Sequence, residues 1–278
     1  MPAPQACPPP PVTLQALTSL SLSGPCFVLV QFLPDLARFP CLKRLQLRAG
    51  SFPRLEGDSW RWTDEYMYSQ LRPAELRHLP PSLESLQLAY FQDIDFEPAA
   101  EAGTAELAAD SGAAAPPAAS PLPALTALEI TGAAHLQLHG PLASLAQLAI
   151  SNCVLASIAQ ASKRLSLPQL TSLQLEEIQY AAGLRCEAMP ALARLKSASS
   201  SDLYAFDSFA ALTSLTHLRL VVTPKNLESA CDLLAGVAAS LRSLSIAVSP
   251  SESDVTASQA AQVLADAGAS QLTQLVRG

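Results

Sequence analysis

The sequence has little glycine, little histidine and few aromatic residues. Its 278 residues include 11 glycines and 4 histidines, and aromatic residues make up 5%. The thinly spread glycines form no Gly-rich phosphate loop or dinucleotide fingerprint, and no G-x-S-x-G elbow that would expose a nucleophilic serine occurs. We therefore expect a protein that is not an enzyme and that uses no cofactor.

Long hydrophobic runs and an excess of positive charge are also missing. The best apolar stretch, "CFVLVQFL", is broken by Gln31 and is far shorter than the roughly 20 residues that cross a bilayer. The 17 Lys and Arg residues are outnumbered by 24 Asp and Glu, which argues against a general electrostatic grip on nucleic acid or anionic lipid. The start, "MPAPQACPPPPV", does not read as a secretory signal. We expect no nucleic acid partner, no membrane partner, and a location in the cytoplasm or the nucleus.

Paired cysteine spacing of the kind that binds zinc is absent as well. The cysteines are far apart and contain no C-x-x-C pair, so reduced thiols are expected rather than a zinc site. His135 and His139 in "HLQLH" are spaced for a helix, but the alternating pattern and the following Gly140-Pro141 favour a strand or loop. Asp93 and Asp95 are read as solvated charges. The six cysteines are Cys7, Cys26, Cys41, Cys153, Cys186 and Cys231.

What the sequence does contain is a repeat, L-x-x-L-x-L, with copies along nearly the whole chain. Several copies carry an upstream "LP" or "MP", as in "LPALTALEI" and "LPQLTSLQL". In a short strand the side chains alternate, so the leucines point into a shared core and the residues between them face solvent. The copies begin at Leu17, Leu42, Leu83, Leu125, Leu145, Leu170, Leu192, Leu215 and Leu241, and a truncated copy begins at Leu272.

These motifs resemble the leucine-rich repeat family, in a degenerate, intracellular, plant-like form. The resemblance covers residues 14–278, as about ten repeats. It implies an α/β fold, a curved solenoid with short parallel strands on its concave face and turns or short helices on its convex face. In such an array the apolar edge of one repeat is buried by its neighbours, so stability is shared along the chain.

Three segments depart from the repeat. The start, 1–13, is predicted to be a Pro-rich extended tail. Residues 51–81 hold Trp60, Trp62, Tyr66 and Tyr68, which predicts a folded insertion with some helix, whose tryptophans either pack on the core or clamp a partner. Residues 97–121 are rich in Ala and Pro and predict a flexible loop.

The segments between strands are predicted to be more helical toward the C-terminus. Apolar residues recur at three and four in "PKNLESACDLLAGVAASL", which predicts an amphipathic helix over 227–241, and a second helix is expected over 253–268. Cys153 falls at the turn that follows a strand, where we expect a buried, unreactive thiol.

The third, fifth and seventh residues of each copy should face solvent on the concave side. Most of them are small and polar, but two basic spots stand out. Arg44 and Arg48 form the first spot. The second consists of Arg194, Lys196, His217 and Arg219, with Glu176 alongside. These seven residues are the predicted partner-binding residues, and an acidic or phosphorylated segment of a protein or peptide is the expected partner. Ordinary solvated charges remain the alternative.

Three functions stay open at this point. The first is a noncatalytic scaffold for protein–protein interaction through the concave face. The second is the substrate-recognition part of an F-box-type ubiquitin-ligase adaptor, which requires the chain to be a fragment because no F-box helices precede Leu14. The third is a regulator of a small GTPase, although no arginine can be singled out for that role.

Overall fold

The computed structural model describes twelve segments of the chain, which together make an α/β fold. The segments are residues 16–50, 54–56, 59–61, 70–96, 122–133, 135–138, 142–153, 167–178, 189–197, 212–222, 227–248 and 274–277. The tail expected at 1–13, the loop expected at 97–121 and the helix expected at 253–268 lie outside these segments.

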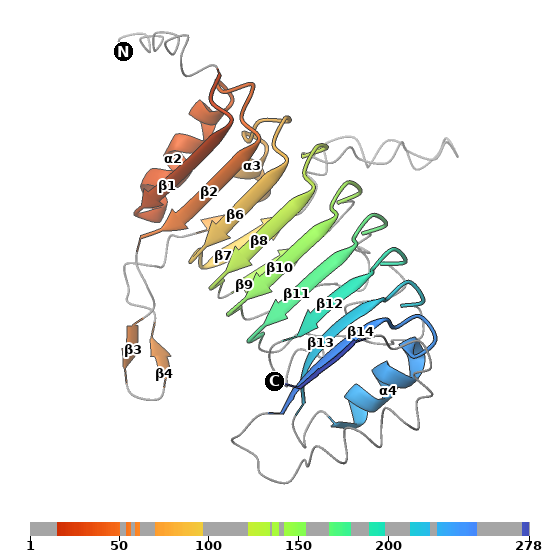
Figure 1. Cartoon of the computed structure of the whole chain (residues 1–278). Coiled ribbons are helices and arrows are strands. Elements are labelled where there is room, and N and C mark those ends of the chain that lie inside the picture. Colours follow the sequence, from red (N-terminus) through yellow and green to blue (C-terminus); the bar gives the residue numbers. More distant parts are fainter. Residues whose placement is uncertain are drawn as a thin grey trace, which may run out of the picture.

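Ten strands form one parallel sheet and lie side by side in chain order (Figure 1). Each strand contains the second half of one L-x-x-L-x-L copy, and the parallel α/β class expected from the sequence is confirmed. The strands are β1 (Ser19–Gly24), β2 (Arg44–Ala49), β6 (Ser85–Ala89), β8 (Ala127–Thr131), β10 (Gln147–Ser151), β11 (Ser172–Glu176), β12 (Arg194–Ser197), β13 (His217–Val222), β14 (Ser243–Val248) and β15 (Gln274–Arg277).

The strands pair in the register of the sequence repeat. Leu148 of β10, for example, lies between Leu128 of β8 and Leu173 of β11, and all three are at most 2% exposed. A one-residue shift would bring these leucines to solvent, so burial of the leucine rows fixes the register. Fully burying one leucine contributes about 1.5–3 kcal/mol to stability.

A turn with buried residues at both ends leads into most strands. The amide of Leu125 donates to the carbonyl of Leu122 at 3.2 Å, and the amide of Leu145 donates to that of Leu142 at 3.0 Å. The same bond, from one residue to the third residue before it, recurs before β2, β6, β11, β12 and β13. The "LP" and "MP" lead-ins of the sequence are therefore the first residues of these turns.

A second turn, in the left-handed region, follows several strands. Tyr90, Gly132, Asn152 and Glu177 have φ angles of 62°, 68°, 52° and 52°. The amides of the first three donate to the end of the next strand, as Asn152 does to the Glu176 carbonyl at 2.8 Å. Glycine is required at 132, because a Cβ there would lie 2.7 Å from Cδ1 of Tyr90.

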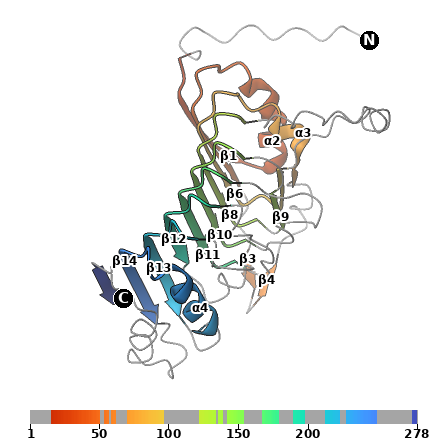
Figure 2. The ribbon, with the colours of Figure 1, turned by 90° about the vertical axis from the view of Figure 1, so that its right-hand side faces the viewer.

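The helices pack on one face of this sheet. They are α2 (Cys26–Leu36), α3 (Pro73–Leu76) and α4 (Leu227–Val237), and their inward leucines join the same core as the strand leucines. Figure 2, with the sheet turned by 90°, shows α2 and α3 on the same side of the strands. Helix α4 confirms the helix expected over 227–241, and its buried residues are Ala230, Leu233, Leu234 and Val237.

Helix α2 was not predicted, and it shows that the described helices are not confined to the C-terminal end of the chain. It is as long as α4, with 11 residues each. Its valines and phenylalanines favour strands, and Pro34 lies inside it, so local preference argued against a helix. Burial of Leu29, Leu33 and Leu36, which recur at four and three, outweighs that preference.

A smaller parallel sheet lies behind the large one. It consists of β5 (Gln70–Leu71), β7 (Asp93–Phe96) and β9 (His135–Leu138), in that order. Ile94, Leu136 and Leu138 are fully buried and belong to the shared core. Asp93 and Asp95 therefore lie on a strand, and "HLQL" is also a strand, which is one of the two possibilities that its alternation favoured.

The aromatic insertion contains strands in its described part. Strands β3 (Arg54–Glu56) and β4 (Ser59–Arg61) pair antiparallel, with Leu55 opposite Trp60. Farther along, β5 and α3 bury Leu71 and Leu76 in the core. Trp62, Tyr66 and Tyr68 lie outside the described residues.

Candidate partner-binding surface

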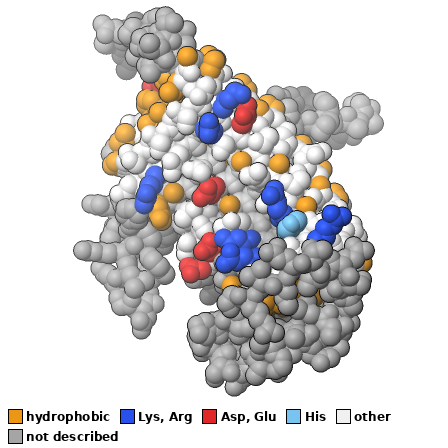
Figure 3. Space-filling view, viewed as in Figure 1, with side chains coloured by type: hydrophobic (Ala, Val, Ile, Leu, Met, Phe, Trp, Pro, Cys, Tyr) orange, Lys and Arg blue, Asp and Glu red, His pale blue; other side chains and the backbone are white. Residues whose placement is uncertain are grey.

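The candidate surface is the face of the large sheet opposite the helices, which we call the open face. It carries the third, fifth and seventh residues of each repeat, because alternation sends the leucines to the other face. In β2, for example, Arg44, Gln46 and Arg48 are exposed while Leu45 and Leu47 are buried. Figure 3 views this face and shows charged side chains scattered over a surface of hydrophobic side chains, other side chains and backbone.

The seven predicted binding residues separate into two groups on the open face. Arg44 and Arg48 lie on β2, and the second group lies on β11 to β13. Strands β6, β8, β10 and β11 intervene between β2 and β12. The two basic spots of the sequence are thus two separate places.

The second group brings four basic side chains together. Arg194 pairs in register with His217, and Lys196 pairs with Arg219. Neighbouring strands are about 4.8 Å apart, and residues two apart on one strand are separated by about 7 Å. Arg194, Lys196, His217 and Arg219 therefore rise from the corners of a small rectangle, which we call the cationic block.

The cationic block borders an open hollow of about 280 Å³ that spans β11 to β14. Its floor contains Leu173, Leu195 and Leu218, which belong to the core below. Among the described residues, no acidic side chain lines it. The remaining lining residues are uncharged and polar: Ser172, Gln174, Ser243 and Ser245.

Hydrogen bonds fix the orientation of one member of the block. The Thr216 hydroxyl donates to the carbonyl of Ala193 at 3.1 Å, and its oxygen lies 2.8 Å from Nδ1 of His217. Either atom can be the donor of this second bond, depending on the tautomer of the His217 ring. The bond holds the ring by its Nδ1 side, and His217 itself is exposed.

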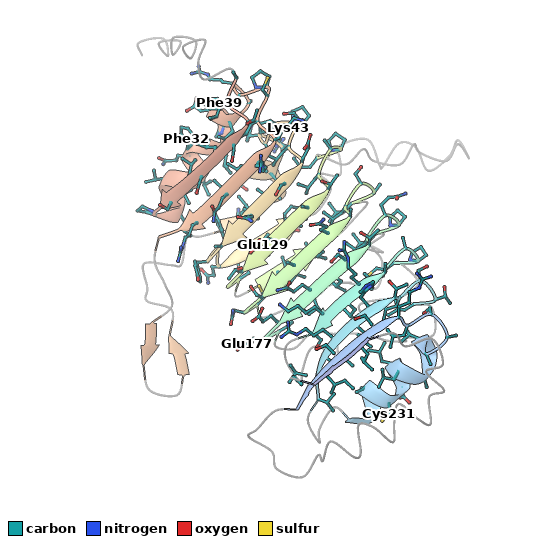
Figure 4. The ribbon with its side chains drawn as sticks, in the orientation of Figure 1. Phe32, Phe39, Lys43, Glu129, Glu177 and Cys231 are labelled. Atoms are coloured by element: carbon teal, nitrogen blue, oxygen red, sulfur yellow. The ribbon has the colours of Figure 1, made fainter. Side chains whose placement is uncertain are left out.

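The cations at the other end of the face have neighbours of their own. Arg48 lies over the ring of Tyr90, with 5.4 Å from Cζ to the ring centroid. Lys43, beside Arg44, forms an ion pair with Glu84 at 2.8 Å. Figure 4 labels Lys43 on this part of the sheet and Glu129 near its middle. Among the described residues, the only other ion pair joins Asp35 and Arg38, so none involves the cationic block.

Glu176 lies beside the hollow but does not line it. It ends β11, two residues beyond Gln174, whose amide donates to the Glu176 carboxylate at 3.4 Å. Glu177 follows it and is exposed. The open face therefore places negative charge next to the cationic block, on the side toward β10.

Four of the residues that line the hollow were not predicted from the sequence. Ser172, Gln174, Ser243 and Ser245 line the hollow but were not chosen as binding residues, since they carry no charge. Their position in the same repeat register as the four cations was the available signal. The contact between Arg48 and Tyr90 had no such signal, because it depends on the left-handed turn at Tyr90.

Cys153 is a core residue, as its place in the repeat predicted. It is 1% exposed, and its Sγ accepts from the amide of Ala133 at 3.4 Å. Burial raises the pKa of the Cys153 thiol to about 11, against smaller lowering effects of backbone hydrogen bonds. A thiol that stays protonated is a poor nucleophile.

Other chemistry and the comparisons add little. The described part of the chain contains no group of three or more His, Cys, Asp or Glu residues that could hold a metal ion. None of the described helices is long and apolar enough to span a membrane. Comparison with protein-family models gave no match, and neither did comparison with curated protein sequences.

Proposed function

We propose that the chain is a leucine-rich repeat solenoid that works as a noncatalytic scaffold and binds a partner protein on its open face. The observation that carries this proposal is the hollow beside the cationic block, on a face that the described helices leave uncovered. A parallel sheet backed by a leucine core presents side chains at fixed spacing, which lowers the ordering cost of binding.

The partner segment is acidic, because the described residues that border the hollow include four basic side chains and no acidic one. Complementary charge speeds association and selects among partners more than it adds affinity. The surrounding serines and glutamine supply hydrogen bonds but no aromatic anchor of the kind that dominates many interfaces. We therefore expect a moderate affinity that weakens as salt is added.

The test is affinity capture with a face variant and a charge-matched control. Replacing Arg194, Lys196 and Arg219 with Ala should abolish capture of the partners bound by the unmodified chain. The control replaces Arg38, Arg72 and Arg77 with Ala, which removes the same charge from residues outside the strands of the open face. Equal loss in both variants, or no loss in the first, would refute binding at the cationic block.

A further inference from the structure

We infer that the cationic block recognises one phosphate monoester, on a phosphorylated serine, threonine or tyrosine side chain of a partner protein. This inference rests on the proposed function and deepens it, because it names the chemical group that the hollow receives.

The first support is the density of positive charge. Lys196 and Arg219 carry like charges and lie directly opposite each other, and Arg194 lies opposite His217. Like charges in such positions repel and destabilise the strand pair. Among the described residues no carboxylate forms an ion pair with any of the four. An anion seated between the two strands would relieve this repulsion.

The second support is the number of charges and acceptors that the site can use. A phosphate monoester carries a charge of about −1.5 to −2 near pH 7 and has three strong acceptor oxygens. An aspartate or glutamate carries one negative charge and two oxygens, which a single arginine can satisfy by itself. With Arg194, Lys196 and Arg219 around one hollow, a phosphate can use all three cations at once.

The size of the hollow and its rim give the third support. Pockets for whole small-molecule ligands measure about 300–1,000 Å³ and are mostly enclosed and apolar. The hollow here is about 280 Å³ and open, which suits one protruding side-chain group. Ser172, Ser243 and Ser245 add hydroxyl donors around the cations, and hydroxyls are common phosphate contacts.

The acidic residues nearby argue against nucleic acid. Nucleic acids present a phosphate at every step of the backbone and need a stripe of cations. Glu176 and Glu129 lie on the same open face, and Glu177 follows Glu176 at the surface. The chain as a whole has a formal net charge of −7. An isolated phosphate on a segment with few other negative charges avoids that repulsion.

The experiment measures binding of the full chain to three fluorescein-labelled, degenerate peptide libraries by fluorescence polarisation. The central residue is phosphoserine in the first, aspartate in the second and serine in the third, and a phosphotyrosine library serves as a fourth probe. We expect at least one phosphorylated library to bind about tenfold more tightly than the aspartate library, and the serine library to bind most weakly.

Variants then assign the binding to the cationic block. Lys196→Ala and Arg219→Ala should each weaken phosphopeptide binding about tenfold, whereas Lys196→Arg, which keeps the charge, should change it little. Arg38→Ala and Arg77→Ala are the matched controls and should leave it unchanged. Glu176→Gln should strengthen binding of library members with acidic residues near the phosphate. Circular dichroism shows whether each variant is folded.

Several results would overturn the inference. The first is equal binding of the phosphoserine, phosphotyrosine and aspartate libraries. The second is an equal loss of phosphopeptide binding in the block and control variants, and the third is tighter binding to vesicles containing phosphatidylinositol phosphates than to phosphopeptides.

Phosphatase treatment of the lysate before affinity capture separates this inference from the proposed function. If capture persists after treatment but still requires Lys196 and Arg219, the scaffold stands and the phosphate inference fails. If the block variants change capture in neither lysate, the proposed function fails too.

Discussion

Arg48 on β2 and the cationic block on β12 and β13 both lie on the open face, at different positions of the repeat, and they differ in what surrounds the positive charge. Arg48 lies over Tyr90, and nearby Lys43 pairs with Glu84, so these cations have partners within the chain. Lys196 and Arg219 instead lie opposite each other on neighbouring strands, and both border an open hollow. The repeat determines where a side chain points, and its neighbours determine whether its charge is available to a partner.

The two ends of the sheet should also differ in how much a core leucine contributes to stability. Leu218, below the cationic block, is 3% exposed, whereas Leu20 in β1 is only partly buried. Leu218→Ala should lower the free energy of unfolding by about 2–5 kcal/mol because it leaves a cavity. Leu20→Ala should cost about 1 kcal/mol, since solvent already reaches that site. Urea unfolding followed by circular dichroism measures both. Equal losses would show that β1 is as well packed as β13.

The next largest contrast is expected between Cys41 and Cys153, in the rate at which each thiol reacts with iodoacetamide. Cys41 is exposed in the turn before β2, and Cys153 is buried after β10. With a pKa of about 11 for the Cys153 thiol, against about 8.5 for an ordinary cysteine, its thiolate fraction at pH 8 is about 200-fold lower. Iodoacetamide labelling of the folded chain, mapped by mass spectrometry, should modify Cys41 at least that much faster. Equal rates would place Cys153 outside the core.

The raised pKa also predicts how stability depends on pH. The thiol ionises more readily in the unfolded chain, at a pKa near 8.5, than in the folded chain, where its pKa is about 11. The contribution of Cys153 is therefore fully present below about pH 8.5 and is lost as pH rises toward 11. Cys153→Ala should remove this alkaline loss, and unfolding curves at pH 8 and pH 10 test it.

The left-handed turns beside the two basic groups should respond in opposite ways to glycine. Glu177, at the end of β11, has a φ of 52°, and this conformation costs a residue with a side chain about 1–2 kcal/mol. Glu177→Gly should raise stability by about 0.5–1 kcal/mol after the entropy of glycine is deducted. Tyr90→Gly relieves the same strain but removes a ring that packs on the core and lies under Arg48, so it should lower stability.

Thermal unfolding compares these turn variants with Glu177→Ala, which removes the charge but keeps the side chain's Cβ. Only the glycine variant should be more stable than the unmodified chain. A gain in both would mean that the negative charge beside Glu176, rather than backbone strain, is what costs stability.

Sequence predicted the large sheet well because its signal is local and repeated. The leucines of each copy are required to face one way, and this fixes the strand, its register and its open face together. The four residues of the cationic block could be placed together from that register alone. The same register assigns Cys153 to the core, where it is 1% exposed.

The other side of the sheet was harder to predict, because its segments depend on what they pack against. Helix α2 is made of residues that favour strands and contains Pro34, and only its contact with the leucine core explains it. The pairing of β5 with β7 and β9 joins residues far apart in the chain, with the 97–121 segment between two of the strands. No pattern in the local sequence predicts contacts between segments so far apart in the chain. The partner of Arg48 was missed for the same reason.

The smallest expected effect bears most directly on the comparison of the two basic groups. Arg48→Gln should lower the free energy of unfolding by about 0.5–1 kcal/mol, because it removes the contact of the guanidinium with Tyr90. Lys196→Gln should leave stability unchanged or raise it by up to about 0.5 kcal/mol, because it relieves repulsion with Arg219. Lys196→Arg keeps the charge and is the control.

Salt separates charge from packing in this pair of variants. Added salt screens the exposed repulsion between Lys196 and Arg219, so any gain from Lys196→Gln should shrink between low and high ionic strength. The loss from Arg48→Gln should change less, since part of it is direct contact between the guanidinium and the ring. If Lys196→Gln is destabilising at every salt concentration, then Lys196 is held by contacts within the chain. The cationic block would then resemble the β2 cations and would have no repulsion for a bound phosphate to relieve.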